Sequence, residues 1–174
     1  IGQNAFSGCN KLHQVVLPIS IEEIEDTAFE NCISLKSISL PMALKTIGDG
    51  ALKGTGLRTI EIPKSVFWLG DGLLADCQSM EHVTIPENIG RIPDRMFEGC
   101  TSLKKVELHE KLGAIGERAF FGCSSLDFIV IPDSVKQIGQ DAFTNTDKQF
   151  IIQCSFGSYA EEYARKNKFK YQLV

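Results

Sequence analysis

Apolar and polar residues follow one pattern that recurs with a period of 23 residues. The most regular copies open with an apolar residue and then read Gly, Ala-Phe and Cys, as Ile115, Gly116, Ala119, Phe120 and Cys123 do, whereas others depart, with Pro93 for the glycine and Leu52 for the phenylalanine. The copies span 1–23, 24–46, 47–68, 69–91, 92–114 and 115–137, with a partial copy at 138–154. The third copy is one residue shorter than the others, near Thr55.

The two halves of each copy predict different local structures. The second half alternates apolar and polar residues, as Leu35, Ile38 and Leu40 show, which predicts a short half-buried strand. A proline such as Pro41 closes it, because proline cannot continue a strand ladder. In the first half the Ala-Phe pair stands about one helical turn beyond the leading residue, which predicts a turn of 3₁₀ or short helix.

No single copy can bury its apolar face alone, so the copies are expected to stack into one elongated core. A period between 20 and 29 residues with L-x-x-I-x-L is the spacing of leucine-rich repeats. We therefore predict an α/β repeat fold, a right-handed leucine-rich repeat solenoid. Its parallel β-sheet would form the concave face, and short 3₁₀ or irregular turns the convex face.

The end of the chain changes character and divides it into two parts. Residues 1–154 are expected to form about seven solenoid turns, and residues 155–174 a cap. Ser158 and Glu161 form a capping box that predicts a helix at about 158–167, and Phe169, Tyr171 and Leu173 then alternate as a strand. This cap should block edge-to-edge pairing. Because the chain begins inside a repeat, we also expect further repeats upstream.

Charge and cysteine content exclude several classes of function. The net charge is −4 and no basic stripe appears, which argues against nucleic acid as a partner. No apolar run approaches the roughly 20 residues of a membrane span. Five of the six cysteines share one position in the repeat, where Thr55 stands in the third copy. Their parallel side chains predict a column of free, buried thiols rather than disulfides.

Candidate chemistry is sparse. His13 and His82 lie three turns apart, about 14 Å, so they cannot share a metal ion. Glu61 and Glu107 would lie about 10 Å apart, just beyond the separation of a glycosidase acid pair. No zinc, phosphate-binding or nucleophile motif occurs. We therefore predict no catalytic, cofactor-binding or metal-binding residue, and hence no enzyme.

The outward residues of the predicted strands are the first candidate binding surface, because solenoid sheets form extended binding faces. Its middle is small and polar and its C-terminal end apolar, so Phe128 and Val130 could anchor a partner. Equally, this end could be tucked under the cap, and Ile151 could belong to either arrangement. The candidate residues are Gln14, Ser37, Ser39, Thr59, Glu61, His82, Thr84, Lys105, Glu107, Phe128 and Val130, with Val16 beside Gln14.

Phe67 and Trp68 form a second candidate, an exposed aromatic patch. They stand where every other copy has residues typical of solvent, and Gly90 in the next copy leaves room beside them. Such aromatics are enriched at binding hot spots. The interpretation that the sequence favours is plainer: the rings fold over a neighbouring turn and cover the defect left by the missing residue.

The strand ending in Leu-Pro, combined with I-G-x-x-A-F-x-x-C, resembles the BspA-like leucine-rich repeat family over essentially the whole chain. The resemblance implies a surface or secreted protein used for adhesion and partner binding. We accordingly expect a non-catalytic, extracellular or cell-surface module that binds a host or matrix protein or a glycan. Two alternatives stay open: a structural spacer carrying other domains, and a carbohydrate-binding accessory module in which Phe67 and Trp68 stack on sugar.

Overall fold

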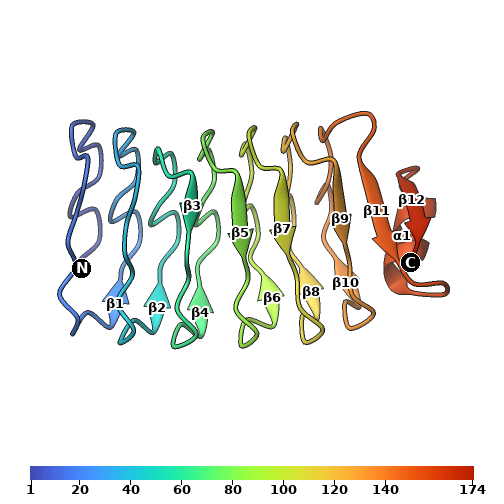
Figure 1. The fold of residues 1–174 in the computed structure, drawn as a ribbon, viewed down its shortest axis with the longest axis horizontal. Helices are drawn as coiled ribbons and strands as arrows, with labels where there is room; N and C mark the ends of the chain where they lie inside the picture. The colour runs from blue at the N-terminus through green and yellow to red at the C-terminus, as the bar shows by residue number, and fades with distance from the viewer.

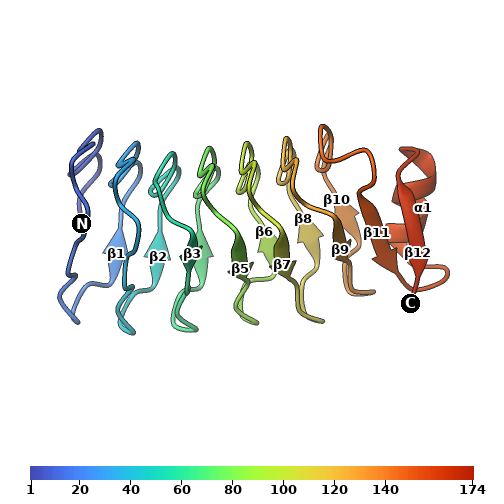
Figure 2. The same cartoon turned by 45° about the horizontal axis from the view of Figure 1, so that its top comes forward.

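In the computed structural model, which describes residues 1–174, the chain forms a parallel-strand solenoid of about seven turns, followed by one helix and a final strand (Figure 1). Each turn corresponds to one copy of the sequence repeat. The turns stack in a nearly straight row in both views (Figures 1 and 2). The predicted leucine-rich repeat solenoid is confirmed.

From the third copy onward, the second half of each copy supplies a first row of strands, which the cap strand extends. Its members form two three-stranded parallel sheets, in the orders β3-β5-β7 and β9-β11-β12, with no ladder between β7 and β9. Along each three-residue strand the central side chain is buried and its neighbours are exposed. The strands are β3 (Thr59–Ile60), β5 (His82–Thr84), β7 (Lys105–Glu107), β9 (Phe128–Val130), β11 (Ile151–Cys154) and β12 (Lys170–Leu173).

The first two copies lack the strand that the pattern predicts there. Residues 14–16 and 37–39 keep the alternation of burial but form no ladder. Val15, Leu17 and Ile38, the inward residues of these two segments, remain only half-buried. Because burial of the apolar face holds neighbouring strands at ladder distance, we attribute the missing strands to this incomplete burial.

A second row of strands was not predicted. It also forms two three-stranded parallel sheets, β1-β2-β4 and β6-β8-β10, with no ladder between β4 and β6. Each strand has only two residues, which is too short for alternation to show in the sequence. The strands are β1 (Glu23–Ile24), β2 (Thr46–Ile47), β4 (Trp68–Leu69), β6 (Arg91–Ile92), β8 (Ala114–Ile115) and β10 (Gln137–Ile138).

The Ala-Phe half of each copy forms the irregular turns that were one of the two predicted forms, and neither a 3₁₀ turn nor a short helix occurs there. Two residues per copy have positive φ, which interrupts any right-handed helix. In the sixth copy these are Arg118 at 53° and Gly122 at 74°. Between them, Phe120 donates its N–H to the carbonyl of Ala142 in the next turn at 2.8 Å. The turns are therefore joined by their own backbone ladder.

In four turns the glycine after the leading apolar residue is required by the close approach of the preceding turn. A Cβ atom added at Gly70 would lie 2.3 Å from the backbone nitrogen of Asp49, a distance that no side chain tolerates. Gly48, Gly116 and Gly139 meet the preceding turn in the same way. The close approach of the two turns lets the Gly70 N–H donate to the Ile47 carbonyl at 2.8 Å. The motif Ile-Gly is thus the contact point between turns.

Phenylalanine rings form a stacked column inside the solenoid. Phe97, Phe120, Phe143 and Phe150 follow one another with centroids 5.2–5.3 Å apart. Leucine takes the same position in the third and fourth copies, which separates this column from the Phe6 and Phe29 pair. Stacked rings contribute about 0.5–1.5 kcal/mol per pair beyond the area that they bury.

The predicted column of buried thiols is confirmed for four of the five repeat cysteines, whereas Cys9 in the first turn is exposed. Each buried thiol donates to a carbonyl of the preceding turn, as Cys123 does to Phe97 at 3.1 Å. Thr55 is buried in the same column and donates to Leu52 at 2.8 Å. Burial raises the pKa of the Cys123 thiol to about 12, and it raises that of Cys100 well above the ordinary value.

The C-terminal cap contains helix α1 (Tyr159–Lys166) and strand β12, as predicted. The Ser158 hydroxyl accepts the Glu161 N–H at 3.2 Å, and the Glu161 carboxylate accepts the Gly157 N–H at 2.7 Å. Ala160 and Ala164 are buried against the solenoid. The expectation that the cap blocks edge pairing is wrong for the first row, because β12 pairs with β11 and forms a new outer edge.

Replacing Ser158 by alanine is expected to lower the free energy of unfolding by about 1 kcal/mol, because the Glu161 N–H loses its acceptor. Urea unfolding followed by circular dichroism measures the difference. Ser7→Ala is the control, since the Ser7 hydroxyl is exposed and makes no hydrogen bond within the chain. Equal stabilities of the two variants would contradict the role assigned to the cap.

Candidate binding surfaces

The outward side chains of the first row form one continuous surface, called the first face below. Strand register aligns them in two columns, with His82 beside Lys105 and Thr84 beside Glu107. Every candidate residue named from the sequence for this face is exposed. The structure therefore brings these side chains together in neighbouring turns, where one partner could contact several of them.

The middle of the first face is polar and makes its own contacts. The Lys105 ammonium lies 2.6 Å from the Glu107 carboxylate, which also accepts the Thr84 hydroxyl at 3.3 Å. The hydrogen bond from Lys105 holds the pKa of the Glu107 carboxyl below its ordinary value. These groups are exposed and paired with one another.

The C-terminal end of the first face is apolar and open. Phe128 and Val130 are 42% and 47% exposed, so the interpretation that the cap covers them is wrong. On β11, Ile151 stands beside Phe128 and is only half-buried. The reason lies in the pairing of β12, which extends the sheet sideways instead of folding over it.

Sequence reasoning missed several residues at the two ends of this face. Lys170 and Gln172 on β12 continue its two columns, and Gln172 accepts a hydrogen bond from Gln153 at 3.0 Å. Their alternation with Phe169, Tyr171 and Leu173 was visible, but the pairing of β12 with β11 was not. At the N-terminal end Ile19 and Met42 are largely exposed, directly after prolines that other copies follow with Lys64, Glu87 or Asp133.

Trp68 begins β4 in the second row, Phe67 directly precedes it, and both line a groove of about 430 Å³. The favoured sequence interpretation placed these rings over a neighbouring turn. Their exposed fractions of 62% and 61% contradict it. Gly90 and Arg91 of the next turn form the opposite wall, which agrees with the space expected at Gly90. Both side chains thus leave more than half of their surface exposed beside a hollow.

The groove coincides with the break between β4 and β6. At the other turns the backbone N–H at this position, from Glu25 or a glycine, donates to the carbonyl of the preceding turn, as Gly70 does to Ile47. Pro93 holds that position here and has no N–H, so the Leu69 carbonyl receives no such bond. Its ring also cannot approach the preceding turn as glycine does. Pro93 therefore removes one of the backbone bonds that join neighbouring turns elsewhere in this row.

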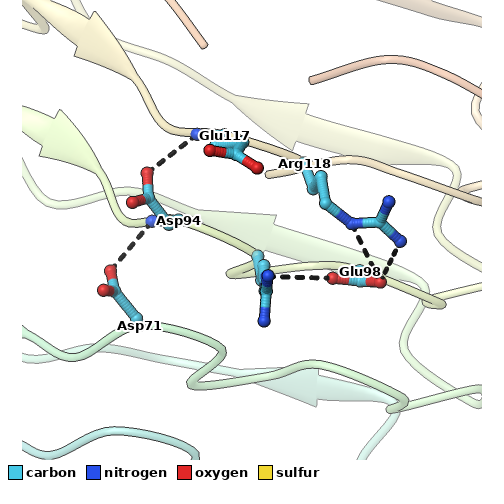
Figure 3. Close-up of polar contacts among 6 residues, drawn as sticks. Asp71, Asp94, Glu98, Glu117 and Arg118 are labelled. Atoms are coloured by element: carbon cyan, nitrogen blue, oxygen red, sulfur yellow. Dashed lines mark hydrogen bonds and ion pairs between the residues drawn. The ribbon is translucent and has the colours of Figure 1, made fainter. Parts of the chain in front are cut away.

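A ladder of carboxylates runs beside the groove and was not predicted. Asp71 accepts the Asp94 N–H at 3.0 Å, and Asp94 accepts the Glu117 N–H at 2.8 Å (Figure 3). Asp26 and Asp49 make the same contact in earlier turns. The signal was an aspartate two residues after the leading apolar residue in four successive copies. Figure 3 also shows Glu98 paired with Arg118.

No group of three or more His, Cys, Asp or Glu side chains is arranged to hold a metal ion. His82 lies on the first face, whereas His109 occupies the turn that joins the two rows. Helix α1 is neither long nor apolar enough to cross a membrane.

Comparison with known proteins gives one family and several similar structures. The sequence matches the family described as BspA type leucine-rich repeat region, with six copies, over residues 1–124 and 91–170. No curated protein gave a significant match.

Three solved structures resemble the chain. One is a leucine-rich repeat protein from Bacteroides ovatus, with 28% identity, 98% of this chain and 54% of that chain covered, and a TM-score of 0.74. Another is a leucine-rich cell surface protein from Faecalibacterium prausnitzii, with 35% identity and a TM-score of 0.77. The match covers 88% of this chain and 42% of that chain. The third is the T. pallidum leucine-rich repeat protein, with 26% identity and a TM-score of 0.71. The match covers 100% of this chain and 78% of that chain. The chain spans about half the length of the first two.

Proposed function

The chain belongs to the BspA type leucine-rich repeat family, and from that premise we propose that it is a non-catalytic adhesion module on the outside of a bacterial cell, which binds an extracellular protein through the first face. One of the similar structures is itself described as a cell surface protein. The observation that carries the proposal is the open apolar end at Phe128 and Val130.

An exposed phenylalanine on a rigid strand is well suited to anchor a partner. Phe128 and Val130 lie on one side of β9, beside Ile151 of β11, so the three form one small apolar patch. Apolar anchors of this kind contribute most of the energy in protein interfaces when a partner excludes water from them. The ladder of β9, β11 and β12 holds their backbones in place, which limits the entropy lost on binding.

The polar part of the first face would orient the partner. Lys105, Glu107 and Thr84 form one hydrogen-bonded cluster a turn away from the apolar patch. Exposed charge pairs contribute little affinity, but they select among partners by complementarity. Lys170 and Gln172 add polar groups on the other side of the patch. The arrangement is an apolar centre flanked by polar residues, as protein interfaces commonly have.

Replacing Phe128 by serine is expected to weaken binding of an extracellular protein by about tenfold or more, because the partner loses the apolar anchor. Surface binding to a panel of matrix proteins and glycans at physiological salt measures the change. Phe156→Ser is the matched control, because Phe156 is 82% exposed and lies in the loop before α1, outside the first face. The urea midpoint of each variant checks that both remain folded.

The outcomes separate the alternatives. Saturable binding to a protein that Phe128→Ser weakens and Phe156→Ser leaves unchanged would support the proposal. Binding to glycans alone would favour the carbohydrate-binding module. If the chain binds nothing on the panel, the spacer becomes the better account of the solenoid.

A further inference from the structure

The groove beside Phe67 and Trp68 combines aromatic faces with unpaired negative charge. Asp49 and Asp71 both line it, one from each of two successive turns. One oxygen of each carboxylate accepts a backbone N–H of the next turn, at 2.8 and 3.0 Å. The other oxygen has no partner in the chain, and neither carboxylate takes part in a salt bridge.

The single cation in the groove does not neutralise these carboxylates. Arg91 forms its ion pair with Asp94, in the turn beyond Asp71. Neighbouring turns stack about 5 Å apart, so Asp49 and Asp71 carry two like charges at close range. A positive group entering the groove would be attracted by both carboxylates.

Exposed aromatic rings add a second attraction for the same kind of group. The face of a tryptophan or phenylalanine ring attracts a cation, and tryptophan does so most strongly. The long apolar stems of arginine and lysine can also pack along a ring while the charged head reaches a carboxylate. Phe67 and Trp68 leave more than half of their surface free for such a contact.

The break between β4 and β6 leaves backbone acceptors on the same wall. The Leu69 carbonyl faces Pro93 and accepts no hydrogen bond from the next turn. The Phe67 carbonyl likewise receives none from Gly90, although the Lys45 and Gly90 carbonyls are used in this way elsewhere in the row. Guanidinium and ammonium groups are rich in donors and can satisfy such acceptors.

We propose that this groove is a second binding site, separate from the first face, and that it takes an arginine or lysine side chain from a basic segment of a partner protein. Trp68 and Phe67 hold the stem of that side chain, and Asp49 and Asp71 hold its charge. A neutral sugar could stack on the same rings, but two unpaired carboxylates favour a cation over an uncharged ligand.

Trp68 is the only tryptophan of the chain, so its fluorescence reports directly on the groove. The probes are blocked peptides in which glycine alternates with arginine, lysine or glutamate, together with a linear malto-oligosaccharide. The intact chain is titrated with each at low salt. We expect a saturable change with the arginine and lysine peptides, none with the glutamate peptide, and weaker binding as salt is added.

The decisive variant is Asp49→Asn/Asp71→Asn. An asparagine carbonyl can still accept the backbone N–H bonds of the ladder, so the fold is kept while the two charges are removed. This variant should bind the arginine peptide about tenfold more weakly. Asp127→Asn/Asp133→Asn removes the same charge from exposed positions several turns away and should bind as the native chain does. Phe128→Ser, which tests the first face, should also leave this titration unchanged.

Three results would overturn the proposal. The first is the absence of a saturable Trp68 response to either basic peptide. The second is equal affinity in the Asp49→Asn/Asp71→Asn and Asp127→Asn/Asp133→Asn variants. The third is saturable binding of the oligosaccharide that does not depend on the two aspartates, which would assign the rings to sugar stacking.

Discussion

Replacing Gly70 by alanine is expected to lower the free energy of unfolding by about 3 kcal/mol or more. The added Cβ would lie 2.3 Å from the Asp49 nitrogen and 2.4 Å from the Gly48 carbonyl carbon. Both are backbone atoms, so no side chain can rotate away to relieve the contact. The turn must move outward instead, which weakens the bond from Gly70 N–H to the Ile47 carbonyl and loosens the core beneath it.

Gly113→Ala is the matched control, because a Cβ at Gly113 would meet only the Gly90 oxygen at an ordinary 3.5 Å. Its stability should stay within about 0.5 kcal/mol of the native chain. Urea unfolding of both variants, followed by Trp68 fluorescence and circular dichroism, gives the comparison. If Gly70→Ala is no less stable than Gly113→Ala, the close approach of the turns does not constrain this position.

Raising the pH from about 8 to about 10 is expected to destabilise the chain, with about 2 kcal/mol of the loss coming from Cys123 alone. Its thiol has a pKa of about 12 when folded, because burial disfavours the thiolate. In the unfolded chain it ionises near its ordinary pKa of about 8.5. The unfolded state therefore binds fewer protons over this range, and the contribution is complete below about pH 8.5 and lost as the pH approaches 12. Cys77 and Cys100 act in the same direction.

Cys123→Thr tests this directly, since Thr55 already occupies the same column. The variant should lose about 2 kcal/mol less than the native chain between the two pH values. Thr55→Cys adds a thiol to the column and should make the loss steeper. Urea unfolding at several pH values measures both, and identical pH dependence in all three proteins would contradict the prediction.

The fold could be predicted because the same pattern of apolar and polar residues recurs along the chain. The outward positions of the first face followed from simple alternation, and the structure leaves each of them exposed. The two positive-φ positions of each copy could also be predicted in part from the sequence. Their second position is Gly, Asn or Asp in every copy, at Gly8, Asn31, Gly54, Asp76, Gly99, Gly122 and Asn145, which are the residue types that tolerate this conformation.

The groove could not be derived from the pattern, because it depends on contacts between copies. Phe67 and Trp68 were noticed as unusual, but whether they covered a turn or stood open depended on the spacing between β4 and β6. Pro93, which cannot donate a backbone bond across this break, belongs to the next copy. Likewise, the carboxylate ladder requires each aspartate to meet the backbone of the following turn. A repeat read one copy at a time predicts positions within a turn better than contacts between turns.

The break between β4 and β6 and the break between β7 and β9 fall between different pairs of turns. Where β4 and β6 are unpaired, β3 and β5 of the same two turns remain hydrogen-bonded. Where β7 and β9 are unpaired, β8 and β10 hold the corresponding turns together. No cross-section of the solenoid therefore lacks both ladders. A force pulling along the solenoid axis, as on an anchored protein attached to a moving surface, would meet at least one backbone ladder between every two neighbouring turns.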